Sequence, residues 1–154
     1  MVKIKVGDEI VQSNITVKIR LDYKGINKPS RFLFGTKNTE KVAEEIREQK
    51  VALLRNVPLQ GINIVDIDLS ADIYTVMDEK LGDEVAYAPV SLTLHADTLE
   101  DVVRFILKEE FRKIEIVEPD NMLLTKSDME RLLFKMNQEI AIYRENLERK
   151  YNQK

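Results

Sequence analysis

One histidine and a small group of aspartates are the residues of this sequence that could do chemistry. His95 is the only histidine, and Asp97 follows it closely along the chain. A histidine beside a carboxylate can act as a general base or hold one side of a metal ion. A transition-metal site needs further nitrogen or sulfur ligands, however, and a catalytic histidine also needs a nucleophile. His95 is therefore either a polar residue on a sheet face or part of a small active site.

Asp66, Asp68 and Asp72 form the second group, on the polar phase of an extended segment. Alternate residues of a strand are about 7 Å apart, so two neighbouring aspartates need ligands from another strand to hold one cation. A small metal-dependent enzyme that uses His95 with Asp66, Asp68 or Asp97 is one functional hypothesis.

The aspartates also have a simpler interpretation. Lys18 and Arg20 occupy the polar phase of another extended segment. If both segments belong to one exposed sheet, each cross-strand charge pair would contribute roughly a few tenths of a kcal/mol. The aspartates would then stabilise the sheet without binding a ligand.

The composition excludes several other chemistries. The chain has no cysteine, so it can form no disulfide, thiolate nucleophile or thiolate metal site. Its 5 glycines form no nucleotide-binding loop or nucleophile elbow, and the His-Glu-x-x-His zinc motif is absent. The net charge of -3 argues against nucleic-acid binding, which needs a basic surface. We therefore expect no cofactor and no nucleic-acid partner.

The 154 residues have the size of one domain. The N-terminal segment Met1–Lys5 lacks the apolar core of a signal peptide. No run approaches the roughly 18 apolar residues that a membrane span needs. We expect a single domain over 1–154, a cytoplasmic location and no membrane partner.

The segment from Val90 to Pro119 organises the predicted fold as strand, helix and strand. Val90, Leu92 and Leu94 alternate with polar residues, as in a half-buried strand. Asp97 precedes Glu100 at the spacing of a capping box, which predicts a helix start there. Apolar residues at helical spacing follow, and alternation resumes at Lys113 until the proline ends it.

The preceding part of the chain predicts further strands and one helix. A short strand is expected at Val2–Val6, a longer one at Ile15–Tyr23 and a hairpin partner at Arg31–Phe34. A helix is expected over Thr39–Lys50, with an extension as far as Arg55.

Ile62 to Val76 is expected to be extended, with a bulge near Ile64 and Val65 because the apolar phase changes there. Another strand begins near Val85, and Pro89 within it indicates a bulge or an edge position. The predicted class is α+β, a ferredoxin-like βαββαβ antiparallel sheet with extra N-terminal strands and a core at about 13–119.

The last predicted helix covers about 127–152. Ser127 and Glu130 have capping-box spacing, and Leu132 and Phe134 are expected to pack on the domain. An apolar seam at heptad spacing follows the helix: Met129, Leu133, Met136, Ile140, Tyr143 and Leu147. This seam either lies along its own domain or pairs with a second copy, and the second part of the helix either projects or pairs.

The rhythm of Val90–Leu94, Leu99–Leu107 and Ile114–Pro119, with a helix after it, is similar to the C-terminal extension of WYL-type bacterial regulators. The family has a glycine between helix and last strand where this chain has Phe111 and Arg112. The resemblance implies a regulatory or sensing role.

Three functional hypotheses follow. The first is a non-catalytic regulatory or protein-interaction domain that forms a homo-oligomer, with a dimer favoured, through its open sheet face, its last helix or both. The second is a small-molecule sensor with a ligand site between subunits, an expectation that rests on fold analogy. The third is the metal-dependent enzyme described above.

Overall fold

The computed structural model describes residues 1–26, 28–29 and 36–152. At its centre β3 (Ile15–Gly25) and β8 (Asp83–Ala96) pair antiparallel along the whole of β3. The other side of β3 carries β9 (Phe111–Glu118), and the other side of β8 carries β6 (Ile62–Asp68) and β7 (Tyr74–Asp78). All pairs are antiparallel and the main order is β6-β8-β3-β9. The predicted α+β class is confirmed.

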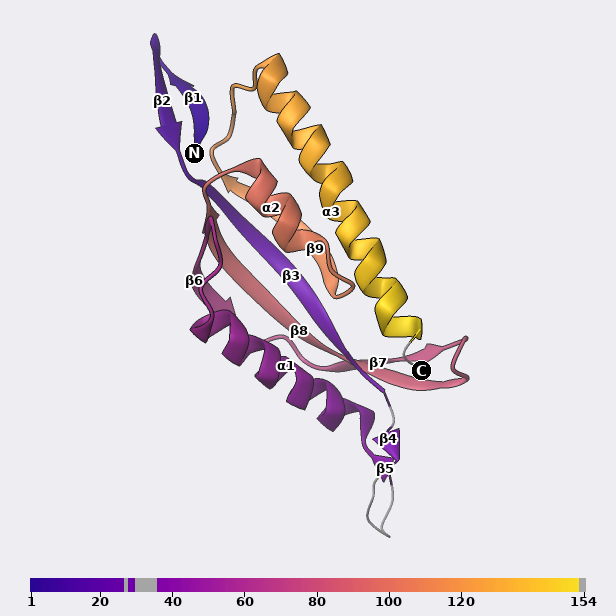
Figure 1. Cartoon of the computed structure of the whole chain (residues 1–154). Helices are drawn as coiled ribbons and strands as arrows, with labels where there is room; N and C mark the ends of the chain where they lie inside the picture. Colours follow the sequence, from indigo (N-terminus) through magenta and orange to yellow (C-terminus); the bar gives the residue numbers. More distant parts are fainter. Residues whose placement is uncertain (27, 30–35, 153–154) are drawn as a thin grey trace.

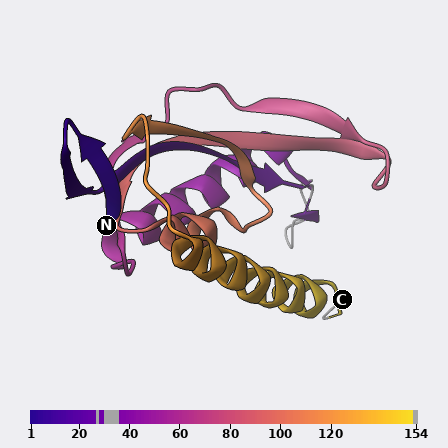
Figure 2. The same ribbon diagram turned by 90° about the horizontal axis from the view of Figure 1, so that it is seen from above.

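Two helices close one face of this sheet. Helix α1 (Thr39–Asn56) precedes β6 in the chain, and α2 (Leu99–Ile106) joins β8 to β9. Figure 2 shows both helices on the same side of the sheet. Apolar residues of β3 and β8 alternate onto this side and are fully buried there: Ile15, Val17, Ile19, Leu21, Val90, Leu92 and Leu94. The predicted alternation in both strands is therefore confirmed.

Gly25 at the end of β3 lets α1 approach the sheet closely. A Cβ atom at this position would lie 2.3 Å from the backbone nitrogen of Ala43. A side chain would therefore force the helix away from the strand.

The extended segment predicted from Ile62 to Val76 is divided into β6 and β7. The register between β6 and β8 shifts between Ile64 and Asp66, which confirms the predicted bulge. Val65 is the extra residue and is 50% exposed, whereas Ile64 and Ile67 on either side of the bulge pack against the core.

Pro89 lies inside the central strand, opposite Asp22 of β3. On its other side the ladder has a gap between the parts of β8 that pair with β6 and with β7. The carbonyl oxygen of Pro89 accepts a hydrogen bond from Arg47 of α1 at 3.2 Å. Since the N and O atoms of one residue face the same neighbour in an antiparallel strand, the missing N–H of proline lies at this gap. Pro89 therefore needs no N–H group for the sheet on this side, as in an edge strand, although β8 is a central strand.

Both predicted capping boxes are displaced along the chain. At α2, Thr98 Oγ1 accepts from the backbone N–H of Asp101 at 3.1 Å, in place of Asp97 and Glu100. At the last helix, Thr125 and Asp128 exchange reciprocal bonds of 3.1 and 2.9 Å, in place of Ser127 and Glu130. Each threonine immediately precedes its helix, where its side chain reaches otherwise unpaired N–H groups.

Helix α3 (Lys126–Asn152) confirms the predicted long C-terminal helix. It runs beside α2 (Figure 1) and lies on the helix-covered side of the sheet (Figure 2). Among residues 1–26, 28–29 and 36–152, no helix combines the length and apolar character of a membrane span.

The N-terminal strand β1 (Val2–Val6) is confirmed, and it pairs with β2 (Glu9–Ser13), which the sequence did not predict. The short strands β4 (Lys28–Pro29) and β5 (Thr36–Lys37) also pair. The predicted strand at 31–34 lies outside the described residues.

Candidate functional site

The sheet face opposite the helices carries a polar hollow of about 410 Å³, which we call the open-face hollow. It is lined from all four strands of the main order. Its polar lining consists of Lys18 and Arg20 of β3, Asp66 and Asp68 of β6, Ser91 and Thr93 of β8, and Lys113 and Glu115 of β9.

The strand register arranges these side chains in two rows. One row across the sheet runs Asp66, Thr93, Lys18 and Glu115, and the other runs Asp68, Ser91, Arg20 and Lys113. Acidic groups on β6 therefore face basic groups on β3 across a central line of hydroxyl groups. This arrangement can hydrogen-bond a polar molecule that carries both charges.

The predicted polar residues are only partly brought together. Asp66 and Asp68 share the hollow, and His95 lies on the same polar phase, opposite Asn63 and Thr16. Asp97 lies in the turn between β8 and α2, where its backbone nitrogen donates to Gly61 at 2.9 Å.

Asp72 lies in the connection between β6 and β7, outside any strand. The predicted ladder of three aspartates therefore ends at Asp68. Within the described ranges no group of three or more histidine, cysteine or acidic residues is arranged to hold a metal ion. A role for His95 in chemistry stays a prediction.

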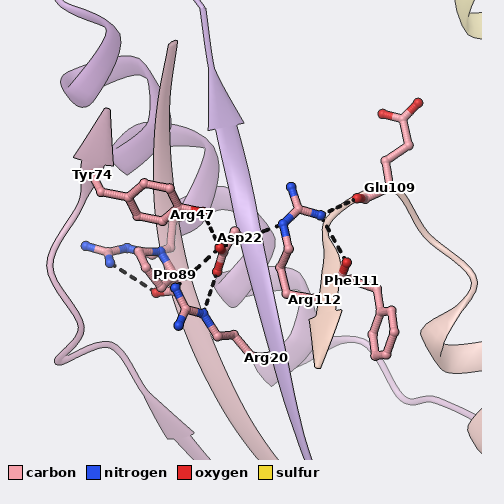
Figure 3. A network of polar contacts seen from close by, with 8 residues as sticks. All are labelled: Arg20, Asp22, Arg47, Tyr74, Pro89, Glu109, Phe111 and Arg112. Atoms are coloured by element: carbon pink, nitrogen blue, oxygen red, sulfur yellow. Dashed lines mark hydrogen bonds and ion pairs between the residues drawn. The ribbon is translucent and has the colours of Figure 1, made fainter. Parts of the chain in front are cut away.

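A second polar cluster surrounds Asp22, which the sequence analysis did not single out. Asp22 lies on the polar phase of β3 but is only 2% exposed. Figure 3 shows it between Arg20, Tyr74 and Arg112. Arg20 Nε donates to its carboxylate at 2.9 Å, the Tyr74 hydroxyl also donates to it, and Arg112 Nε lies 3.8 Å away.

Two aromatic rings and a bulge close this cluster. Tyr74 stacks on Tyr87 with ring centroids 5.3 Å apart, and the Arg112 guanidinium lies 5.4 Å from the Tyr87 ring centre. The β3–β9 register shifts beside Arg112, and such a bulge can redirect a side chain. The cluster thus joins β7 and β9 to β3 on the face that no helix covers.

The electrostatics of the cluster agree with this geometry. The hydrogen bond to Asp22 raises the pKa of Arg20 above its usual value. Burial, followed by the bond to Asp22, raises the pKa of Tyr74. Both shifts keep the donors protonated beside the buried carboxylate. Because Arg20 and Tyr74 donate hydrogen bonds to its carboxylate oxygens, Asp22 has the environment of a structural residue.

The third candidate is the apolar seam of α3. Leu133 and Ile140 are 59% and 51% exposed, and Met129 and Met136 are exposed as well, while Tyr143 and Leu147 are half-buried. The structure therefore leaves most of the predicted seam uncovered by its own domain.

The side of α3 that packs on the domain lies next to the seam and contains Leu132 and Glu139. Leu132 is half-buried as predicted, and Glu139 is buried with an ion pair to Lys135 at 2.9 Å. Phe134, by contrast, is 72% exposed, so the expectation that it packs on the domain was wrong.

The C-terminal end of α3 is also attached to the domain. Lys150 Nζ lies 2.7 Å from a carboxylate oxygen of Glu109, which follows α2, and the Tyr151 hydroxyl lies 3.4 Å from the other oxygen. The second part of the helix therefore does not project. Its seam runs along the flank of a docked helix.

Comparison with known proteins adds no family to these observations. No family model matches the chain, and neither a curated protein nor a solved structure matches it.

Proposed function

We propose that this chain is a regulatory or protein-interaction domain that self-associates through the α3 seam. The observation that carries the proposal is the exposure of Met129, Leu133, Met136 and Ile140 at heptad spacing on a helix already docked by its other flank. Burying such a series against a second helix would remove apolar area from water, at about 25 cal/mol per Å².

We also propose the finer fold assignment. The order β6-β8-β3-β9, with α1 between β3 and β6 and α2 between β8 and β9, supports a ferredoxin-like βαββαβ unit. In this assignment β7 is an insertion that extends the β8 side of the sheet, and β1, β2 and α3 are additions at the two ends.

Sedimentation equilibrium at tens of micromolar protein tests the self-association. We expect the unmodified chain to be a dimer and the seam variant Leu133→Gln/Ile140→Gln to be a monomer. The variant Phe134→Gln/Ile142→Gln is a matched control, because it removes two exposed apolar side chains of α3 outside the seam. A monomeric unmodified chain, or equal weakening by both variants, would contradict the proposal.

A second candidate function rests on the open-face hollow. The facing acidic and basic groups around Ser91 and Thr93 favour a small zwitterionic molecule, such as a free amino acid, as the ligand of a sensing domain. Thermal unfolding with the twenty amino acids at millimolar concentration tests it, because a ligand at a hundred times its Kd stabilises by about 2.7 kcal/mol. The stabilisation should disappear in Asp66→Asn/Asp68→Asn, and no shift with any amino acid would contradict it.

A further inference from the structure

The outer flank of the α3 seam carries a charge pattern that is complementary to itself. Glu130, Asn137 and Arg144 each follow a seam residue by one position, and Lys126 and Glu148 extend the same side of the helix. Lys126 and Glu148 are equally far from Asn137, and so are Glu130 and Arg144. In both pairs, Lys126 with Glu148 and Glu130 with Arg144, the two residues carry opposite charges.

These four charged residues are available to a partner. All four are exposed, and within the part of the chain that the structure describes none of them forms an ion pair. The other flank of the seam is occupied by the chain's own domain, since Glu139 is buried there. A second copy can therefore reach the seam from the Glu130–Arg144 side.

We infer that two copies pair through α3 in an antiparallel arrangement, with a two-fold axis beside Asn137. This inference rests on the proposed function, that the seam holds a second copy, and adds the direction and register. Around this axis Glu130 of one copy faces Arg144 of the other, and Lys126 faces Glu148. A parallel pair in register would instead place residues of the same charge at the same level of the two helices, which is unfavourable.

The apolar seam fits the same axis. An antiparallel register centred at position 138, one residue from the centre of the charge pattern, places Met136 opposite Ile140 of the partner, Leu133 opposite Tyr143, and Met129 opposite Leu147. All six seam residues then face an apolar side chain, each pair occurring twice because the interface is symmetric. The charge pattern therefore selects the antiparallel direction, and the apolar pattern is compatible with it.

Cysteine crosslinking tests the direction of the pair cleanly because the chain has no cysteine of its own. We expect Asn137→Cys to form a disulfide-linked dimer under mild oxidation, since the two residues lie at the axis. Glu130→Cys alone should not crosslink, because in the antiparallel pair its two copies are roughly 20 Å apart along the helices at 1.5 Å per residue. A mixture of Glu130→Cys with Arg144→Cys should crosslink.

Charge reversal tests the register in solution. Glu130→Lys and Arg144→Glu should each weaken the dimer by roughly 3- to 10-fold, since each creates two like-charge contacts. The double variant Glu130→Lys/Arg144→Glu should restore the original affinity, because it exchanges the two charges without changing their pairing.

The outcomes separate the two proposals. A dimer in which Glu130→Cys crosslinks with itself, or in which the double reversal fails to restore affinity, would overturn the antiparallel register while leaving self-association intact. A monomeric unmodified chain would overturn the proposed function.

Discussion

The core-facing residues of β8 and the seam residues of α3 are both regular apolar series in the sequence, but they lie in opposite environments in the structure. Leu92 and Leu94 of β8 are at most 1% exposed beneath the helices, whereas Leu133 and Ile140 of α3 are more than half exposed. Both series repeat at the period of their secondary structure. Periodicity therefore identifies a face that can be buried, while the element that covers this face depends on the rest of the fold.

The largest expected difference between the two series is in the stability of a single chain. Leu92→Ala should lower the free energy of unfolding by about 2–5 kcal/mol, because it leaves a cavity in a fully packed core. Leu133→Ala should change it by less than about 0.5 kcal/mol, because the side chain is exposed in the single chain.

Urea unfolding of both variants at a protein concentration low enough to keep the chain monomeric measures this difference. Equal losses would show that the seam is buried within its own domain.

The uncovered sheet face provides the next contrast, since it contains a buried group without a covering helix. Asp22→Asn should cost roughly 2 kcal/mol, because the charge-assisted bonds to Arg20 and Tyr74 weaken. Asp68→Asn on the same face serves as the control, because Asp68 is exposed and should change stability little. Chemical denaturation at neutral pH compares them, and equal effects would contradict a special role for the Asp22 cluster.

Tyr23, on the helix-covered face, predicts a dependence of stability on alkaline pH. Burial, followed by the nearby charge of Glu110, raises its pKa above the usual value. The folded chain thus holds this proton more tightly than the unfolded chain, so its contribution is complete below about pH 10 and is lost as the pH rises further. The slope for one tyrosine reaches at most about 1.4 kcal/mol per pH unit.

Thermal unfolding between neutral pH and pH 11 measures this loss. Tyr23→Phe should lose stability less steeply than the unmodified chain over the alkaline part of this range. Comparing the two chains cancels the effect of Lys108, whose pKa is lowered by burial and which contributes in the opposite direction. Identical slopes would show that Tyr23 is not responsible.

The smallest expected contrast is between the two helix caps. Thr98→Ala and Thr125→Ala each remove a side-chain acceptor for a helix N-terminus, at about 1 kcal/mol each. The cost should be larger at α2, because the bonds between Thr98 and Asp101 are partly buried, whereas the matching bonds between Thr125 and Asp128 are exposed. Differential scanning calorimetry of the two variants would rank the two losses of stability, and a larger loss for Thr125→Ala would contradict this expected order.

Much of the fold could be predicted because its causes are local. The alternation from Ile15 to Tyr23, the bulge near Val65 and the seam of α3 are periodic patterns that the sequence shows directly. The capping boxes were misplaced because several threonine, serine and acidic residues near each helix start have similar spacing. The actual helix start selects among these residues.

Sequence patterns alone were enough to locate the central strands and the three helices and to identify their apolar faces. The burial of Asp22 depends on the tertiary structure, because its partners Tyr74 and Arg112 come from strands far away in the sequence. The exposure of the α3 seam also depends on the tertiary structure, because α3 docks on the domain through the neighbouring flank that contains Glu139. Long-range pairing of this kind depends on the geometry of the whole sheet, which no short sequence pattern encodes.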